Sequence, residues 1–289
     1  MEFSFVTKEK YRATAVMVVV AVLWSTGGIL IKLISWNPLC IASVRGLIAS
    51  LVIVIFMKFG GLKFAFNKYA AISAVSVAGC MTCFVVATKL TTAANAIVIQ
   101  YLSPVWILII AAVFYKQKAS RQDKIAVAIC FFGIVLFFLD KISPGKMAGN
   151  IIAIIAGIFL AVLFTANEKA DNDDIRYTGL VCGHLLTFIV GLSGFFVSDF
   201  HTTNTEIVYI IILGVFQMGL TYALYAYASS RISSLACSLI GMIEPILNPV
   251  WVALFYNEQP GRFALAGGVI IIATLTVWVI RQNRSAGTE

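Results

Sequence analysis

The sequence has few charged residues, and this scarcity limits the class of protein it can encode. Only 12% of its 289 residues are Asp, Glu, Lys or Arg, whereas soluble domains contain roughly 25%. Hydrophobic residues make up 61% of the chain, and its mean hydropathy is +0.96. Composition therefore excludes an ordinary soluble domain and predicts a polytopic membrane protein.

Metal-ligating and nucleophilic residues are scarce as well. The chain has two histidines and six cysteines, and the cysteines all lie in apolar stretches, which is typical of small buried residues rather than a disulfide framework. Cys80 and Cys83 have zinc-ligand spacing, but no second pair and no histidine cluster accompany them. Without a phosphate loop or a nucleophile constellation, we expect no metal, no cofactor and no catalytic residues.

Long polar stretches are missing, which leaves no room for a soluble domain. The net charge of +8 sits in short clusters between apolar runs, as in cytoplasmic loops, so nucleic acid is not an expected partner. The basic N-terminus leads into an apolar run that continues past Gly28 without a small-residue cleavage site. This pattern predicts a first transmembrane helix and not a signal peptide.

What the sequence does contain is a series of apolar stretches near the length of about 20 residues that a membrane span needs. They cover residues 13–34, 38–57, 69–88, 93–115, 122–139, 147–167, 177–198, 207–228, 233–256 and 262–280. The predicted fold class is therefore an all-α integral membrane protein with ten transmembrane helices.

The distribution of Lys and Arg predicts the orientation of these spans. With the N-terminus inside, most basic residues fall in cytoplasmic loops, and the external loop 198–206 has none. The exceptions on the outside are Lys32, Lys89, Lys141, Lys146 and Arg262. We therefore predict a multi-pass protein of the cytoplasmic (plasma) membrane with both termini in the cytoplasm.

The two halves of the chain repeat each other. The matching segments are Ala21-Val-Leu-Trp-Ser25 with Ala161-Val-Leu-Phe-Thr165, Phe114-Tyr115 with Phe255-Tyr256, and Ser103-Pro104 with Glu244-Pro245. Alternatively, Pro104-Val-Trp106 pairs with Pro249-Val-Trp251, a slip of about one helical turn that presents the same face. Because each half has five spans, the second enters the membrane from the opposite side. We predict a first repeat at 1–140, an external linker at 141–149 and a second repeat at 150–289.

Several local features accompany this architecture. They are Trp24 followed by small residues and Lys32, Pro38 followed by Arg45, and in the last part of the chain Ser234 to Pro245, Glu258 and Gly267-Gly268. With these features the whole chain resembles the drug/metabolite transporter superfamily and, within it, the EamA family, although Gln117 stands where the second half has Glu258. The resemblance implies a secondary transporter of small organic metabolites, with amino acids or related amphipathic solutes as the leading class and export more common than uptake.

Glu244 is the only carboxylate deep inside a predicted span. A charge at the bilayer centre costs about 2.5–3.5 kcal/mol on insertion scales, so we expect a wet cavity or a partner around it. Two interpretations stay open: binding of a substrate amine or a coupling proton, and a hydrogen bond to a neighbouring helix. Pro104, Pro245 and Pro249 predict helix breaks near the midplane or, alternatively, packing kinks.

Further polar and aromatic residues share helix faces with this carboxylate or with its repeat mate. Glu244 and Asn248 share one face, and Gln217, Thr221 and Tyr225 follow one another at i, i+4 and i+8. We predict that the substrate cavity is lined by Trp24, Asn95, Gln100, Ser103, Gln217, Thr221, Tyr225, Glu244 and Asn248. Packing between helices is the alternative role for these residues.

Arg45 and His184 lie inside spans 2 and 7. Arg45 can extend its side chain to the membrane surface, or it can point inward and bind a substrate carboxylate, which together with Glu244 suits a zwitterion. His184 can relay a proton or form a hydrogen bond inside the bundle. The predicted function is metabolite transport by alternating access, possible proton coupling included, and the alternatives are an uncoupled facilitator or a membrane-embedded enzyme or sensor.

Overall fold

A computed structural model of the chain describes residues 2–91, 93–139, 147–256 and 261–285, and these residues form helices and no strand. The helices are α1 Glu2–Ser25, α2 Gly27–Lys32, α3 Pro38–Phe59, α4 Lys68–Leu90, α5 Ala93–Gln100, α6 Ser103–Phe114, α7 Arg121–Phe137, α8 Met147–Lys169, α9 Asp173–Gly191, α10 Ser193–Phe196, α11 Asn204–Ile212, the π-helix η2 Leu213–Leu220, α12 Thr221–Ser229, α13 Ser234–Gly241, α14 Ile243–Tyr256 and α15 Arg262–Ser285. The all-α prediction is thus confirmed for the described part of the chain.

Among the described residues, 7 helical segments are long and apolar enough to cross a membrane. They are Pro38–Phe59, Lys68–Thr88, Asn95–Phe114, Met147–Lys169, Asp173–Phe196, Asn204–Ser229 and Arg262–Gln282. The predicted spans 13–34, 122–139 and 233–256 are also helical, but they are interrupted or shorter. The count of ten spans therefore stays a prediction. Most of the linker 141–149 and all of Glu258 lie outside the described residues.

Short polar side chains at the loop ends explain where many helices begin. Asn37 accepts a hydrogen bond from the backbone N–H of Leu39 and directly precedes Pro38, which suits the first turn of α3. Asn67 caps α4 in the same way. Capping boxes begin α7 and α11, where a Ser or Thr exchanges hydrogen bonds with an acidic residue three positions later.

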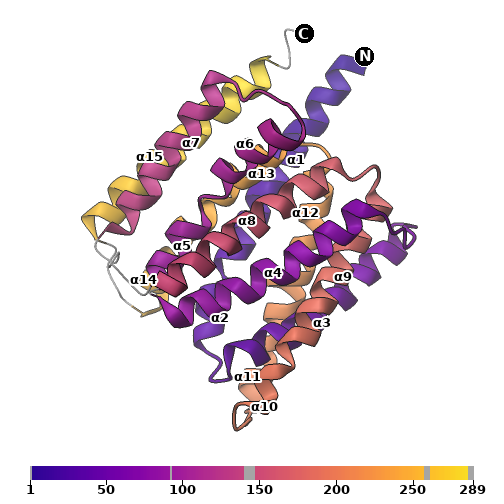
Figure 1. Ribbon diagram of the computed structural model, residues 1–289, viewed down its shortest axis with the longest axis vertical. Helices are drawn as coiled ribbons and strands as arrows, with labels where there is room; N and C mark the ends of the chain where they lie inside the picture. The colour runs from indigo at the N-terminus through magenta and orange to yellow at the C-terminus, as the bar shows by residue number, and fades with distance from the viewer. Residues whose placement is uncertain (1, 92, 140–146, 257–260, 286–289) are drawn as a thin grey trace.

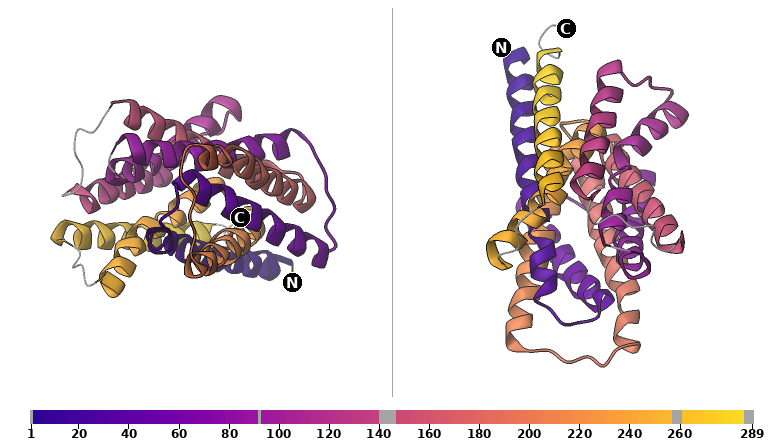
Figure 2. Two further views of the ribbon diagram at one scale, coloured as in Figure 1. Left: turned by 90° about the horizontal axis from the view of Figure 1, so that it is seen from below. Right: turned by 90° about the vertical axis from the view of Figure 1, so that its left-hand side faces the viewer.

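The helices form a bundle in which residues from both halves of the chain are interleaved (Figure 1). Helix α4 packs along α8 and α9, α3 packs along α9 and η2, and α7 pairs with α15. Some of these helices approach so closely that only glycine fits. A Cβ at Gly183 in α9 would lie 2.6 Å from Cβ of Val77 in α4, and a Cβ at Gly267 in α15 would lie 2.5 Å from the carbonyl oxygen of Gly133 in α7. The start of α1 and the end of α15 lie at the same end of the bundle (Figures 1 and 2).

Large apolar side chains cover much of the outside of the bundle. Phe132 is 60% exposed, Val269 67% and Leu254 70%. Such a surface is unfavourable in water and is what a lipid environment requires.

Three of the predicted spans are interrupted near their middle. Thr26 separates α1 from α2, Tyr101 and Leu102 separate α5 from α6, and Met242 separates α13 from α14. Pro104 and Pro245 lie in the first turn of α6 and α14, where an N–H has no partner inside the helix. They therefore begin the second half-helix after each interruption. Helix α14 continues through Pro249.

Loops of the two halves are joined at both ends of α3. At one end the backbone N–H and Oγ of Ser35 each donate to Oε1 of Glu206, at 2.7 Å. At the other end the N–H of Lys63 donates to Oδ1 of Asp174, and the N–H of Ala65 donates to the Thr178 hydroxyl, both at 3.0 Å. We call these contacts the two loop clasps.

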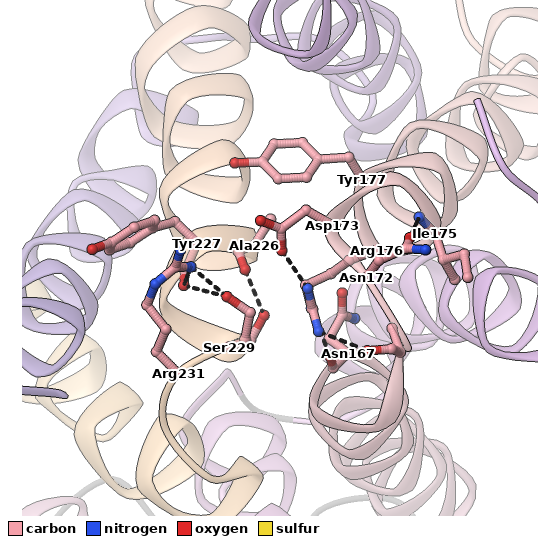
Figure 3. A network of polar contacts seen from close by, with 12 residues as sticks. Asn167, Asn172, Asp173, Ile175, Arg176, Tyr177, Ala226, Tyr227, Ser229 and Arg231 are labelled. Atoms are coloured by element: carbon pink, nitrogen blue, oxygen red, sulfur yellow. Dashed lines mark hydrogen bonds and ion pairs between the residues drawn. The ribbon is translucent and has the colours of Figure 1, made fainter. Parts of the chain in front are cut away.

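Arg176 of α9 closes the adjacent end of α8 (Figure 3). Its side chain is buried, and it donates to the carbonyl oxygens of Asn167 at 2.7 Å and Ala170 at 2.9 Å. The guanidinium also pairs with the Asp173 carboxylate in the first turn of α9. These carbonyls are among those that a helix end leaves without partners, so Arg176 stabilises the turn between α8 and α9.

We expect Arg176→Met to lower the free energy of unfolding by about 2–4 kcal/mol, because it leaves buried carbonyls and a carboxylate without their donor. The measurement is thermal unfolding of the purified protein in a fixed detergent. Lys58→Met removes an exposed charge at the end of α3 and serves as the control. Equal midpoints for the two variants would show that the Arg176 contacts add nothing to stability.

Candidate functional site

The candidate site lies where the interruptions of spans 4 and 9 meet. The Tyr101 hydroxyl, in the first interruption, donates to Oε2 of Glu244 at 2.9 Å. The same hydroxyl lies 3.4 Å from the carbonyl oxygen of Gly241, the last residue of α13. Glu244 is half-buried in the first turn of α14, where the helix dipole favours a negative charge. Tyr101 of the first half thus bonds to two groups of the second half, the Glu244 carboxyl group and the Gly241 carbonyl at the end of α13.

Tyr101 was missed by the sequence analysis. It directly follows Gln100, which is a predicted lining residue, but a helical wheel through an unbroken span turns it away from that face. Its role depends on the interruption at residues 101 and 102, which the sequence marks only by Pro104 two residues later.

Other polar contacts join the same two spans or border them. The hydroxyls of Ser103 and Ser238 lie 2.8 Å apart and are buried. Gln100 donates to Sγ of Cys80 in α4 at 3.4 Å.

Free space adjoins the interruption of span 9. Gly241 is buried, yet a Cβ placed on it would meet no atom of the described residues within 4 Å. Gly241 therefore has open space on the side where a Cβ would stand.

Arg45 points into the protein and does not extend to the membrane surface. It is 8% exposed, its Nη2 lies 3.7 Å from the Met81 thioether sulfur, and its Nε has no partner among the described residues. The guanidinium is close enough to interact electrostatically with Tyr222 and Glu244, although no ion pair joins it to a carboxylate in the described part of the chain. A buried guanidinium with no oxygen acceptor retains its capacity to bind one.

His184 lies against the same region from α9. It is fully buried, and neither ring nitrogen has a hydrogen-bond partner among the described residues. Its ring stands edge-on to Tyr222, with 4.4 Å between centroids. The alternative of a hydrogen bond inside the bundle is thus not what the structure shows.

An aromatic cluster borders these groups. Tyr222 and Tyr225 of α12 are fully buried and lie 5.6 and 5.9 Å, respectively, from the Trp24 ring, centroid to centroid. Phe164 of α8 lies 5.5 Å from Tyr225. The Tyr225 hydroxyl is buried without a partner in the described residues. Tyr222 is not among the predicted lining residues, but its ring contacts both Trp24 and His184.

The predicted lining residues divide into two groups in the structure. Trp24, Gln100, Ser103, Tyr225 and Glu244 lie around the interruptions, as the contacts above show. Gln217 joins them from η2, since its Nε2 donates to the carbonyl oxygen of Trp24 at 3.3 Å while its Oε1 is buried without a described partner.

The second group lies apart from Glu244 or cannot be placed. Asn95 lies 3.4 Å from both Thr91 and Asn150, where the ends of α4 and α8 meet. Thr221 bonds back to the carbonyl oxygen of Phe216 in the π-helix. The side chains of Asn248 and Pro249 are outside what the structure describes.

The site therefore has one cationic group without an acceptor, one carboxyl group held by a single hydroxyl, a void and aromatic rings. Its members come from both halves of the chain. Such an arrangement can bind a small solute that carries both charges, and it has no nucleophile and base arranged for covalent chemistry among the described residues.

Filling the void at Gly241 tests whether solute passes there. We expect Gly241→Leu to fold normally and to lose most of its transport, because the added side chain occupies this free space. Gly183→Ala is the control, since its Cβ would collide with Val77 and lower the thermal midpoint. Flux of Gly241→Leu at the wild-type rate in proteoliposomes would remove the void from the solute path.

Comparison with known proteins supplies the family. The sequence profile of the EamA-like transporter family matches the chain twice, at residues 12–139 and 147–280. An uncharacterized transporter of Archaeoglobus fulgidus is 22% identical over 91% of this chain and 95% of the relative. An S-adenosylmethionine uptake transporter of Rickettsia bellii is 23% identical over 71% of this chain and 70% of the relative. The pseudopaline exporter CntI of Pseudomonas aeruginosa is 22% identical over 79% of this chain and 81% of the relative.

A solved crystal structure shares the fold, with a TM-score of 0.81 over 94% of this chain and 98% of that chain at 15% identity. The profile match covers nearly the whole chain and confirms the resemblance drawn from Trp24, Arg45 and the Pro-containing spans. The chain belongs to the EamA-like transporter family of the drug/metabolite transporter superfamily.

Proposed function

We propose that the protein is a secondary transporter of zwitterionic small metabolites, with amino acids as the leading class, and that it works by alternating access between two inverted five-helix repeats. The observation that carries this proposal is the pair Arg45 and Glu244. Each is an ionisable group in the interior, the two come from different halves of the chain, and no protein ion pair joins them. A substrate carboxylate suits Arg45, and a substrate ammonium suits Glu244.

Two observations support the inverted repeat. The family profile matches each half separately, at residues 12–139 and 147–280. In addition, helix packings occur in pairs that are exchanged when the halves are exchanged: α4 on α8 corresponds to α12 on α1, and α4 on α9 corresponds to η2 on α3. The packings of α3 on α9 and of α7 on α15 correspond to themselves. This is the pattern expected for ten spans related by a twofold axis in the membrane plane.

The proposed orientation places both termini in the cytoplasm. The start of α1 and the end of α15 lie at the same end of the bundle (Figure 2), together with the loops that contain most of the Lys and Arg residues. This agrees with the excess of positive charge on cytoplasmic loops.

We further propose that the protein exports its solute and couples this transport to protons. The relatives include one named for uptake and one named for export, so direction has to be measured. Glu244 is the proposed coupling group because its single donor, Tyr101, belongs to the opposite half. Movement between the halves would break this hydrogen bond and change the environment of the carboxyl group.

Removing the ionisable group at 244 tests proton coupling. We expect Glu244→Gln to abolish accumulation driven by a pH gradient and to leave exchange of labelled solute across the membrane intact. The control is Ser103→Ala at the repeat-related position, which removes a hydroxyl pair but no ionisable group. Accumulation by Glu244→Gln at the wild-type level would identify an uncoupled facilitator and a structural carboxyl.

Charge recognition is tested by thermal shift of the purified protein against a metabolite panel, since a ligand of the folded state raises the unfolding midpoint. We expect an amino acid to stabilise the protein, and its decarboxylated amine and its N-acetyl derivative to do so weakly. Arg45→Met should weaken binding of the amino acid by about 10–100-fold, the value of a charge-assisted hydrogen bond of 1.5–3 kcal/mol. It should leave the affinity for the amine unchanged.

The matched control for Arg45→Met is Arg121→Met, which removes an exposed arginine at the start of α7. If amino acid and amine bound equally well to the wild-type protein, Arg45 would not be the carboxylate site.

A further inference from the structure

A second cavity lies at the far end of α6, away from Glu244. A cavity of about 620 Å³ opens between α6 and the connection to α7. Its apolar wall is formed by Val105, Leu108, Ile109 and Ala112, which follow one face of α6, and its polar rim is formed by Lys116, Gln117, Lys118 and Lys124. We call this cavity the basic groove.

The basic groove exists because α6 and α7 pack on different partners. Helix α6 packs on α8 and α13, whereas α7 turns away to pair with α15 (Figure 1). The outer face of α6 is therefore left uncovered, and Ile109 is 44% exposed on it. In a membrane this apolar face is in contact with lipid chains.

The position of the lysines along the helix matches the membrane surface. Helix α6 has 12 residues and begins at the interruption near the midplane, so it is about 18 Å long. This is slightly more than half of a hydrocarbon core of about 30 Å. The three lysines therefore lie at the level of the phospholipid phosphates, and the apolar wall lies along the acyl chains below them.

The charge of the basic groove is not neutralised by the protein. The three lysine side chains are exposed and form no hydrogen bond or ion pair with the described residues. Asp123, next to Lys124 in the sequence, forms no ion pair with these lysines among the described contacts and bonds to neutral groups instead. One of its oxygens accepts from Trp278 and Gln282 in α15, both at 3.0 Å, and the other accepts from Ser120.

Lys116 has a backbone conformation that is unusual for lysine. Its φ is +54°, in the left-handed region where glycine or asparagine is less strained than lysine. This turn lets the N–H of Gln117 donate to the Ala111 carbonyl at the end of α6, at 3.0 Å. The equivalent loop of the second half, on the opposite side of the membrane, reads Asn257-Glu258-Gln259 and has no lysine. Lys116, Lys118 and Lys124 therefore have no basic counterpart in the second half.

We propose that the basic groove binds an anionic phospholipid of the cytoplasmic leaflet. The phosphate lies among Lys116, Lys118 and Lys124, and one acyl chain lies along Val105, Leu108, Ile109 and Ala112. Basic pockets between transmembrane helices on the cytoplasmic side suit anionic headgroups. The choice of leaflet rests on the proposed orientation, whereas lipid binding does not depend on the transported solute.

Native mass spectrometry of the full chain tests this assignment by comparing retained phosphatidylglycerol with phosphatidylcholine. We expect the wild-type protein to retain phosphatidylglycerol preferentially. The triple variant Lys116→Gln, Lys118→Gln, Lys124→Gln should lose this preference, with retention reduced by about tenfold or more. The matched control replaces the exposed lysines Lys8, Lys58 and Lys63 by Gln and should retain the lipid as the wild type does.

Two more variants separate charge from shape. Lys116→Gly removes one charge but relieves the strained φ, so it should weaken phosphatidylglycerol binding without lowering the thermal midpoint. Ala112→Trp keeps every charge but fills the apolar wall and should also weaken binding.

Three results would overturn the assignment. They are equal retention of both lipids by the wild type, unchanged retention in the lysine triple variant, and displacement of the lipid by millimolar glycerol phosphate, which would indicate a site for a free phosphate and not for a lipid.

Discussion

The hydrocarbon core of a membrane offers no hydrogen-bond partner, and the interior of this protein follows from that constraint. Any interruption of a helix at that depth exposes backbone groups that the protein itself or trapped water must satisfy. The interruptions at Tyr101 and Met242 face each other across the two halves, and the Tyr101 hydroxyl reaches both the Gly241 carbonyl and the Glu244 carboxyl. The Tyr101 hydroxyl thus satisfies polar groups that the interruption at Met242 leaves without a partner inside the helix.

Two buried arginines, Arg176 and Arg45, differ in the groups that surround their side chains. Arg176 is 4% exposed and Arg45 8%, so both have lost nearly all contact with their surroundings outside the protein. Arg176 has two carbonyls and a carboxylate around it, and its charge stabilises the turn between α8 and α9. Among the described residues, the one hydrogen-bond contact of the Arg45 side chain is to the Met81 thioether. A charge held in this way adds little to stability, because burial removes its hydration and no oxygen acceptor among the described residues replaces it.

Much of the architecture was predictable from sequence because it depends on local patterns. Apolar stretches of span length and the low charge predicted the helices and the membrane environment. Glu244 and Arg45 could also be identified from the sequence, because each is a charged residue inside an apolar stretch. The arrangement around them depended on tertiary contacts.

The residues that were misplaced or missed show why. Asn95 and Ser103 share a face only if their helix is continuous, and the interruption at residues 101 and 102 separates α5 from α6. Asn95 therefore bonds with Asn150 at the end of the bundle, while Tyr101 turns to Glu244. Likewise, the π-helix at Leu213–Leu220 has a wider turn than an α-helix, which changes the face on which Thr221 lies. No residue type in that segment predicts this change.

The two loop clasps have a mechanical consequence. Because they join the loops at the two ends of α3 to α11 and α9, each end of α3 is fixed to a helix of the second half. Three other spans are interrupted near their middle instead. The interruptions separate α1 from α2, α5 from α6, and α13 from α14. Arg45 of α3 and His184 of α9 thus lie on helices that pack across the two halves, whereas Tyr101 lies at, and Glu244 lies next to, an interruption.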